Sequence, residues 1–134
     1  MNDLSMLSMI GSPEIVNGEY AARQNLISDL EGIPRIIIGK CDLSYNRNLK
    51  SLAGIGKLVT EIGHKLIIPS SIKSNILGVF MINGIEELQI QSGSIPVPLF
   101  KSVNIVNNHL AGDRDILACQ EELISAGFKD FAKL

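Results

Sequence analysis

The residues best suited to chemistry in this chain are its two histidines and its two cysteines. His64 follows a glycine and His109 follows two asparagines, and neither lies at metal-ligand spacing from Cys41 or Cys119. Zinc sites bring Cys and His together at short, characteristic intervals, so this pattern does not indicate one. Free cysteines of cytoplasmic proteins are usually buried. We therefore predict ordinary surface or turn histidines and two buried thiols.

Pairs of acidic residues are the other candidates for chemistry, and they occur at Glu86-Glu87 and Glu121-Glu122. Neighbouring residues on a strand or a helix point in different directions, so neither pair converges on one substrate. The sequence also lacks a nucleophile elbow, a phosphate-binding loop, a dinucleotide fingerprint and an HExxH motif. We expect no catalytic residues, no metal and no cofactor, and we keep a small unrecognised nuclease as an alternative.

Charge and composition exclude several classes of partner. The 134 residues carry 12 basic and 14 acidic side chains, 46% are apolar, and only 4% are aromatic. Scattered basic residues and few aromatic rings offer little to attract phosphates or to stack on bases. No apolar run approaches the ~18 residues of a membrane span, and no signal-peptide pattern opens the sequence. We expect a single cytoplasmic domain over residues 1–134 that binds neither nucleic acid nor membrane.

A repeat organises the chain that must position these residues. Gly18, Gly39 and Gly63 recur at intervals of 21 and 24 residues, and each opens a strand-like run. Gly-x-Pro turns lie between the first runs, where glycine permits turn conformations and proline fixes φ. Leucine-rich repeats have a period of about 20 to 29 residues. The spacing therefore favours a short solenoid.

Each repeat contains a short strand marked by two apolar residues with one residue between them. The five pairs are Tyr20/Ala22, Cys41/Leu43, Leu66/Ile68, Leu88/Ile90 and Val103/Ile105. Alternate residues of a strand face opposite sides, so each pair would face a core. Asn25, Asn46 and Asn108 follow the second apolar position by three residues, where an amide side chain can satisfy backbone groups at the bend.

A returning layer would cover the core from the other side. We place in it Leu26, Leu30, Ile33 and Ile36 of one repeat and Leu49, Leu52, Ile55 and Leu58 of the next. Stacking such units in parallel buries aliphatic side chains between the two layers.

Helical spacing replaces the repeat near the C-terminus. A turn at Gly112, followed by acidic residues and then by apolar residues at helical spacing, predicts a helix from about Asp113 to Ala126. Phe128 and Phe131 are expected to dock a last helical turn onto the body. Residues 113–134 would cap a repeat region at about residues 11–110, because the end of a solenoid is apolar. A second cap is predicted where Leu4, Leu7 and Ile10 recur at helical spacing.

The outward positions of the strands form the candidate binding surface. We assign to it Lys40, Asp42, Ser44, Lys65, Ile67, Glu87, Gln89, Gln91 and Asn104. The surface is mixed in charge, and Ile67 and Val106 are expected to be exposed on it, which suits a protein partner better than a polyanion. A solvated face without a partner is the alternative interpretation. Asp42 and Ser44 are the first functional candidates.

The segments Leu30-Glu31-Gly32-Ile33-Pro34 and Cys41-Asp42-Leu43-Ser44-Tyr45-Asn46 resemble leucine-rich-repeat-like small proteins of tailed bacteriophages related to the T-even group. The resemblance covers about Gly11 to Leu58 well and Leu66 to Asn108 poorly. It implies an α/β fold, a short irregular solenoid with a curved, mainly parallel β-sheet and a C-terminal helical cap. It also implies a non-enzymatic protein of an infected bacterial cytoplasm that binds and blocks a host defence or regulatory protein. A structural or assembly component that forms a homo-oligomer is the alternative.

Overall fold

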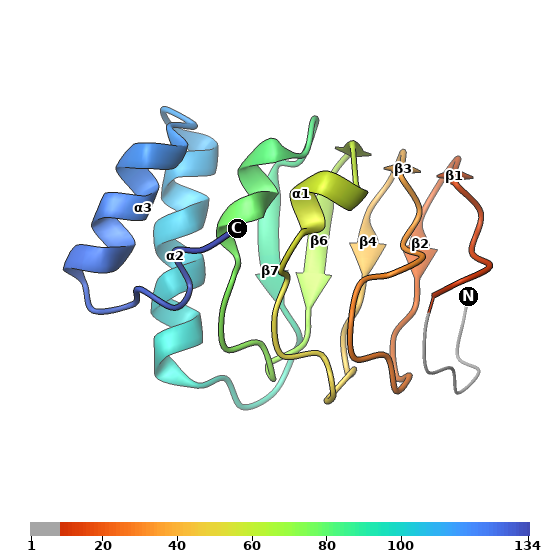
Figure 1. The fold of residues 1–134 in the computed structure, drawn as a ribbon, viewed down its shortest axis with the longest axis horizontal. Helices are drawn as coiled ribbons and strands as arrows, with labels where there is room; N and C mark the ends of the chain where they lie inside the picture. Colours follow the sequence, from red (N-terminus) through yellow and green to blue (C-terminus); the bar gives the residue numbers. More distant parts are fainter. Residues whose placement is uncertain (1–8) are drawn as a thin grey trace.

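Successive segments of the chain lie side by side in the computed structural model, which describes residues 9–134 (Figure 1). The elements are β1 (Ile15–Val16), β2 (Tyr20–Ala21), β3 (Ile36–Ile37), β4 (Cys41–Asp42), α1 (Ile55–Leu58), β5 (Glu61–Ile62), β6 (Lys65–Ile68), η1 (Leu77–Met81), β7 (Glu87–Ile90), α2 (Val97–Ala111) and α3 (Ile116–Ser125). They form an α/β fold with parallel sheets and C-terminal helices. No helix within residues 9–134 is long and apolar enough to cross a membrane.

The larger sheet has four strands in the order β2-β4-β6-β7, all parallel. Tyr20 pairs with Cys41, Cys41 with Leu66, and Leu66 with Leu88, which confirms the register predicted for the first four strand pairs. The apolar pairs face inward: Ala22, Leu43, Ile68 and their partners are buried. Irregular spacing after residue 58 therefore does not shift the strands out of register.

The smaller sheet, in the order β1-β3-β5, was not predicted as strands. Each of its strands has only two residues, too few to show an alternating pattern. Burial in this part of the molecule also corrects part of the expected returning layer. The buried side chains are Ile27, Ile37 and Val59, each one position after the predicted Leu26, Ile36 and Leu58, whereas Leu30, Ile33, Leu49, Leu52 and Ile55 are buried as predicted. A bend changes the phase by one residue, and a one-residue shift exchanges the two faces of an extended chain.

The Asn46 amide satisfies backbone groups at the bend after β4, as the sequence predicts, and it also bonds the preceding segment of the chain. Its Nδ2 donates to the carbonyl oxygens of Ala22 and Leu43, both at 2.8 Å, and its Oδ1 accepts from the backbone N–H of Asn25 at 3.1 Å. In the next repeat Ser71 takes this position, and its hydroxyl donates to the carbonyl oxygen of Leu49 at 2.7 Å. The side chains of Asn46 and Ser71 thus satisfy backbone groups at these two bends.

Helix α2 occupies the place where a fifth strand pair was predicted, so the assignment of Val103, Ile105 and Asn108 to a repeat is wrong. Leu99, Val103, Val106 and Leu110 are buried at helical spacing, and that period prevails over the single apolar alternation at residues 103 and 105. Pro96 and Pro98 do not end an element here. They begin the helix, because proline in the first turn lacks only an N–H that has no intrahelical partner.

The C-terminal helical region begins with α2 at Val97, earlier than the predicted residue 113. The Asn107 amide faces the edge of β7: its Oδ1 accepts from the Leu88 N–H and its Nδ2 donates to the Leu88 carbonyl oxygen, both at 2.8 Å. A single side chain therefore replaces the two hydrogen bonds that a neighbouring strand would supply. In Figure 1, α2 stands beside β7 and α3 lies outside it.

The predicted C-terminal helix is α3, and it starts three residues later than expected. Asp115 is its N-cap, since its Oδ1 accepts from the N–H groups of Leu117 at 3.0 Å and Ala118 at 3.1 Å. Gly127, with φ +90°, follows the end of the helix as predicted. Phe131 is buried and meets Phe128 edge-to-face, in a segment of turns rather than a helical turn.

The predicted N-terminal cap falls mostly outside the described residues. Leu4 and Leu7 are not among them. Ile10 lies in a turn and is 67% exposed, so it does not serve as a capping side chain.

Candidate functional site

The outer face of the four-stranded sheet, called the sheet face below, collects most of the predicted binding residues. Its central row is Ala21, Asp42, Ile67 and Gln89, which pair in register on β2, β4, β6 and β7. Lys65 and Glu87 pair in the row before it. Lys40, Ser44 and Gln91 lie next to the ends of the same strands. Asn104 alone is on α2, and so it belongs to a wall beside the face rather than to a row of it.

The floor of the sheet face is more closely packed than the sequence suggests. Asp42 and Ile67 are each only 8% exposed, and Ala21 is equally covered. Adjacent strands lie about 4.8 Å apart, so side chains of the same row on neighbouring strands cover one another. The prediction that Ile67 is exposed is therefore wrong, and the prediction for Val106 is wrong because that residue is buried within α2.

Asp42 and Ser44 form the hydrogen-bonded centre of this floor. Asp42 Oδ1 accepts from the Ser44 N–H at 3.0 Å and from the Ser44 hydroxyl at 2.7 Å. Both residues are buried. These two bonds hold the carboxylate in one orientation at the end of β4.

A polar rim borders the floor on the side where the strands begin. Lys65 Nζ donates to Gln89 Oε1 at 3.0 Å, and Lys40 Nζ lies 3.8 Å from the Glu19 carboxylate. Such exposed pairs contribute little to stability. Glu19 and Glu87 offset the charges of Lys40 and Lys65, so the rim is mixed in charge, which suits a protein surface better than a phosphate backbone.

Tyr45 borders the opposite end of the strands, and the sequence analysis did not select it. Its backbone φ is +61°, and its N–H donates to Gln91 Oε1 at 2.7 Å. The phenol donates to the carbonyl oxygen of Ser92 at 3.3 Å, so the ring crosses to a segment 47 residues away. A cavity of about 160 Å³ lies beneath it, bordered by Pro69 and Ser70. Nothing in the sequence pattern signals a left-handed residue here.

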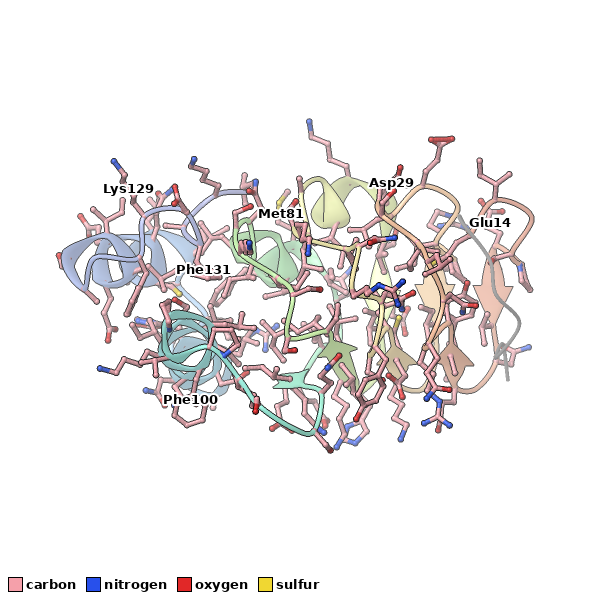
Figure 2. The ribbon with its side chains drawn as sticks, turned by 90° about the horizontal axis from the view of Figure 1, so that it is seen from below. Glu14, Asp29, Met81, Phe100, Lys129 and Phe131 are labelled. Carbon is pink, nitrogen blue, oxygen red and sulfur yellow. The ribbon has the colours of Figure 1, made fainter. Side chains whose placement is uncertain are left out.

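Helix α2 forms a wall at the β7 side of the sheet face. A groove of about 210 Å³ runs between them, lined by Glu87, Gln89, Phe100 and Asn104 among others. Phe100 is 50% exposed and points to the side on which the sheet face lies, whereas Met81 lies on the opposite side (Figure 2). Phe100 was not selected from the sequence, because the nearby Val103/Ile105 pair was interpreted as a strand and not as part of a helix. Proline followed by apolar residues at helical spacing is the signal that would have found it.

The histidines and cysteines lie away from the sheet face. Cys41 and Cys119 are buried and free, as predicted. Burial raises the pKa of the Cys41 thiol far above its usual range and raises that of Cys119 to about 12, so both are poor nucleophiles at neutral pH. His64 makes an exposed pair with Glu86 at 2.8 Å. Within residues 9–134, no cluster of three or more His, Cys, Asp or Glu residues is placed to hold a metal ion.

His109 is more than an ordinary turn residue, since it joins α2 to α3. Its Nδ1 lies 3.0 Å from Asp113 Oδ1 and its Nε2 lies 2.8 Å from Glu122 Oε1. Hydrogen bonds to Asp113 and then to Glu122 raise the pKa of His109, against a smaller opposing effect of burial. The protonated imidazole can donate to both carboxylates at once, whereas the neutral ring can donate to only one.

We expect stability to fall as the pH rises through the raised pKa of His109. The protonated imidazole stabilises the folded state fully at a pH below its pKa in the unfolded chain, about 6.5. This stabilisation is lost as the pH rises above the higher pKa of the folded state. Urea unfolding at about pH 6 and about pH 9 should show a larger loss for the native chain than for His109→Gln. His64→Gln, which changes an exposed histidine, is the control. An equal loss in the native chain and in His109→Gln would contradict the assignment.

Comparisons with family models, with curated proteins and with solved structures found no match to this chain. Function is therefore inferred from the geometry of the sheet face. A closely packed central row, a polar rim and aromatic side chains at two borders are features of a binding surface.

Proposed function

We propose that the protein is a non-enzymatic interaction module, built as a short irregular solenoid, whose sheet face binds and blocks a host protein. The observation that carries this proposal is the continuous register of Ala21, Asp42, Ile67 and Gln89 across four strands. The register makes one surface from residues far apart in sequence. Tyr45 and Phe100 border that surface with exposed aromatic rings.

Two features support the solenoid part of the proposal. Tyr20, Cys41, Leu66 and Leu88 take equivalent places at intervals of 21, 25 and 22 residues. The Asn46 amide also bonds the backbone of the preceding repeat, a role that leucine-rich repeats give to asparagine. Solenoids commonly bind partners along an extended sheet.

The character of the surface supports a protein as the partner. Protein interfaces have a closely packed centre, a polar rim, and an excess of aromatic residues. The sheet face has buried Asp42 and Ile67 at its centre and the charged side chains of Lys40 and Lys65 at its rim. Its mixed charge gives no advantage to a polyanion. The bacteriophage origin and the bacterial host come from the sequence resemblance and stay predictions.

Affinity capture from a bacterial host lysate tests the proposal. Gln89→Arg places a bulky cation in the central row, and we expect at least about a tenfold loss of captured partner. Thr60→Arg is the matched control, because it adds the same charge at an exposed position beside the smaller sheet. Thermal unfolding should show that both variants are folded. Equal capture by the native chain and by Gln89→Arg would contradict the proposal.

A further inference from the structure

We propose that Asp42 is the anchor for an arginine side chain of the protein partner. This inference rests on the proposed function and names the chemistry at the centre of the same surface. Asp42 lies in the central row with Ala21 on one neighbouring strand and Ile67 on the other. Only 8% of its surface is exposed, yet it lies on the face that points away from the core.

Only one of the two oxygen atoms of the Asp42 carboxylate accepts hydrogen bonds within the described residues. Oδ1 accepts twice from Ser44, whereas Oδ2 has no hydrogen-bond partner among residues 9–134. No lysine or arginine of the described chain lies within ion-pair distance of Asp42. Two lysines beside this row have other partners, since Lys40 pairs with Glu19 and Lys65 bonds to Gln89.

A carboxylate in such surroundings is costly unless a cation or further donors reach it. Removing a charged group from water is unfavourable when nothing replaces the lost hydration. Within residues 9–134, the Ser102 hydroxyl is the only fully enclosed side-chain polar atom without a partner. Asp42 Oδ2 also lacks a partner among these residues, so it is not fully enclosed. A donor from outside can therefore approach Oδ2 along the sheet face.

Arginine fits this position better than lysine. A guanidinium is planar and weakly hydrated, so it tolerates contact with apolar neighbours such as Ala21 and Ile67. It can donate one N–H to Asp42 Oδ2 and direct others to neighbouring acceptors, with Ser44 Oγ beside the carboxylate. A lysine ammonium would lose more hydration at the same place.

A purely structural role for Asp42 is the competing explanation. Its Oδ1 organises the turn at Ser44, and asparagine could do this equally well. Asp42→Asn therefore separates the two roles, because it keeps an acceptor for Ser44 and replaces the charged Oδ2 with a neutral N–H donor. Ser44→Ala is the complementary variant, since it keeps the charge and removes one donor.

The test uses N-acetyl-arginine methylamide as the probe, titrated into the full chain at constant ionic strength and followed by amide NMR shifts. We expect saturable shifts at Ala21, Asp42 and Ile67 with a dissociation constant on the order of 10 mM. Asp42→Asn should lose these shifts, and Ser44→Ala should weaken them, because one of the two bonds that orient the carboxylate is gone. Asp29→Asn, which removes an exposed carboxylate outside the sheet face, should keep them. N-acetyl-lysine methylamide should bind several-fold more weakly.

The inference is overturned if the arginine probe causes no saturable shift, if Asp42→Asn responds like the native chain, or if the lysine probe binds equally well. Such a result would leave the proposed function intact provided that Gln89→Arg still loses the captured partner. Unchanged capture by Gln89→Arg would instead contradict the proposed function itself.

Discussion

Asn46→Ala should lower the free energy of unfolding by about 4 kcal/mol, because it leaves several buried backbone groups without partners at once. The carbonyl oxygens of Ala22 and Leu43 each lose a donor, and the N–H of Asn25 loses its acceptor. Each unsatisfied buried group costs roughly 1–3 kcal/mol. Since total stabilities are about 5–15 kcal/mol, this change should bring the chain close to unfolding.

Asn48 provides the matched control two positions away. It is exposed, so Asn48→Ala should change the stability by no more than about 0.5 kcal/mol. Urea unfolding followed by circular dichroism measures both variants against the native chain. Similar stabilities for Asn46→Ala and Asn48→Ala would show that the amide does not hold the repeats together.

Gly63→Ala is the second substitution for which we expect a large effect. A Cβ at this position would overlap the carbonyl oxygen of Ile38 in the preceding repeat. The two backbones are held close by the bond from the Gly63 N–H to the Ile37 carbonyl oxygen, at 2.9 Å. The overlap can be removed only if the two segments move apart. We therefore expect the free energy of unfolding to fall by about 3 kcal/mol.

The equivalent glycines of the earlier repeats give a graded comparison. A Cβ at Gly39 would lie 3.0 Å from the Gly18 carbonyl oxygen, whereas a Cβ at Gly18 would have no atom within 4 Å. Gly39→Ala should therefore cost about 1 kcal/mol, and Gly18→Ala should be neutral or slightly stabilising. Thermal unfolding of the three variants tests this order. An equal effect at Gly18 and Gly63 would contradict the close stacking of these segments.

The sequence pattern was sufficient for the fold where side chains repeat in phase. Cys41/Leu43 and Leu66/Ile68 were placed correctly because the strand period of two is distinct in both. Asn46 follows the first pair at the expected distance, whereas the use of Ser71 in that place after the second pair was not predicted. The strand pattern gave a wrong prediction at α2. There Val103 belongs to a row of buried residues at helical spacing, and Ile105 follows it at the strand spacing only by chance. The two-residue strands of the smaller sheet could not be found, since backbone pairing at that length leaves no periodic signal.

The candidate site was predictable to the same extent. Register alone placed Asp42, Ile67 and Gln89 in one row, because equivalent positions of parallel strands must lie side by side. Burial of that row was not predictable, since it depends on how neighbouring side chains cover one another. Tyr45 and Phe100 were missed for different reasons: a left-handed backbone reorients the first, and the unpredicted helix carries the second.

The affinity of the purified captured protein for three forms of the chain tests most directly whether the sheet face is the binding surface. Isothermal calorimetry should give a dissociation constant for Gln89→Arg that is at least about tenfold higher than that of the native chain. Thr60→Arg should match the native value. Equal dissociation constants for all three forms would show that the partner binds elsewhere on the molecule.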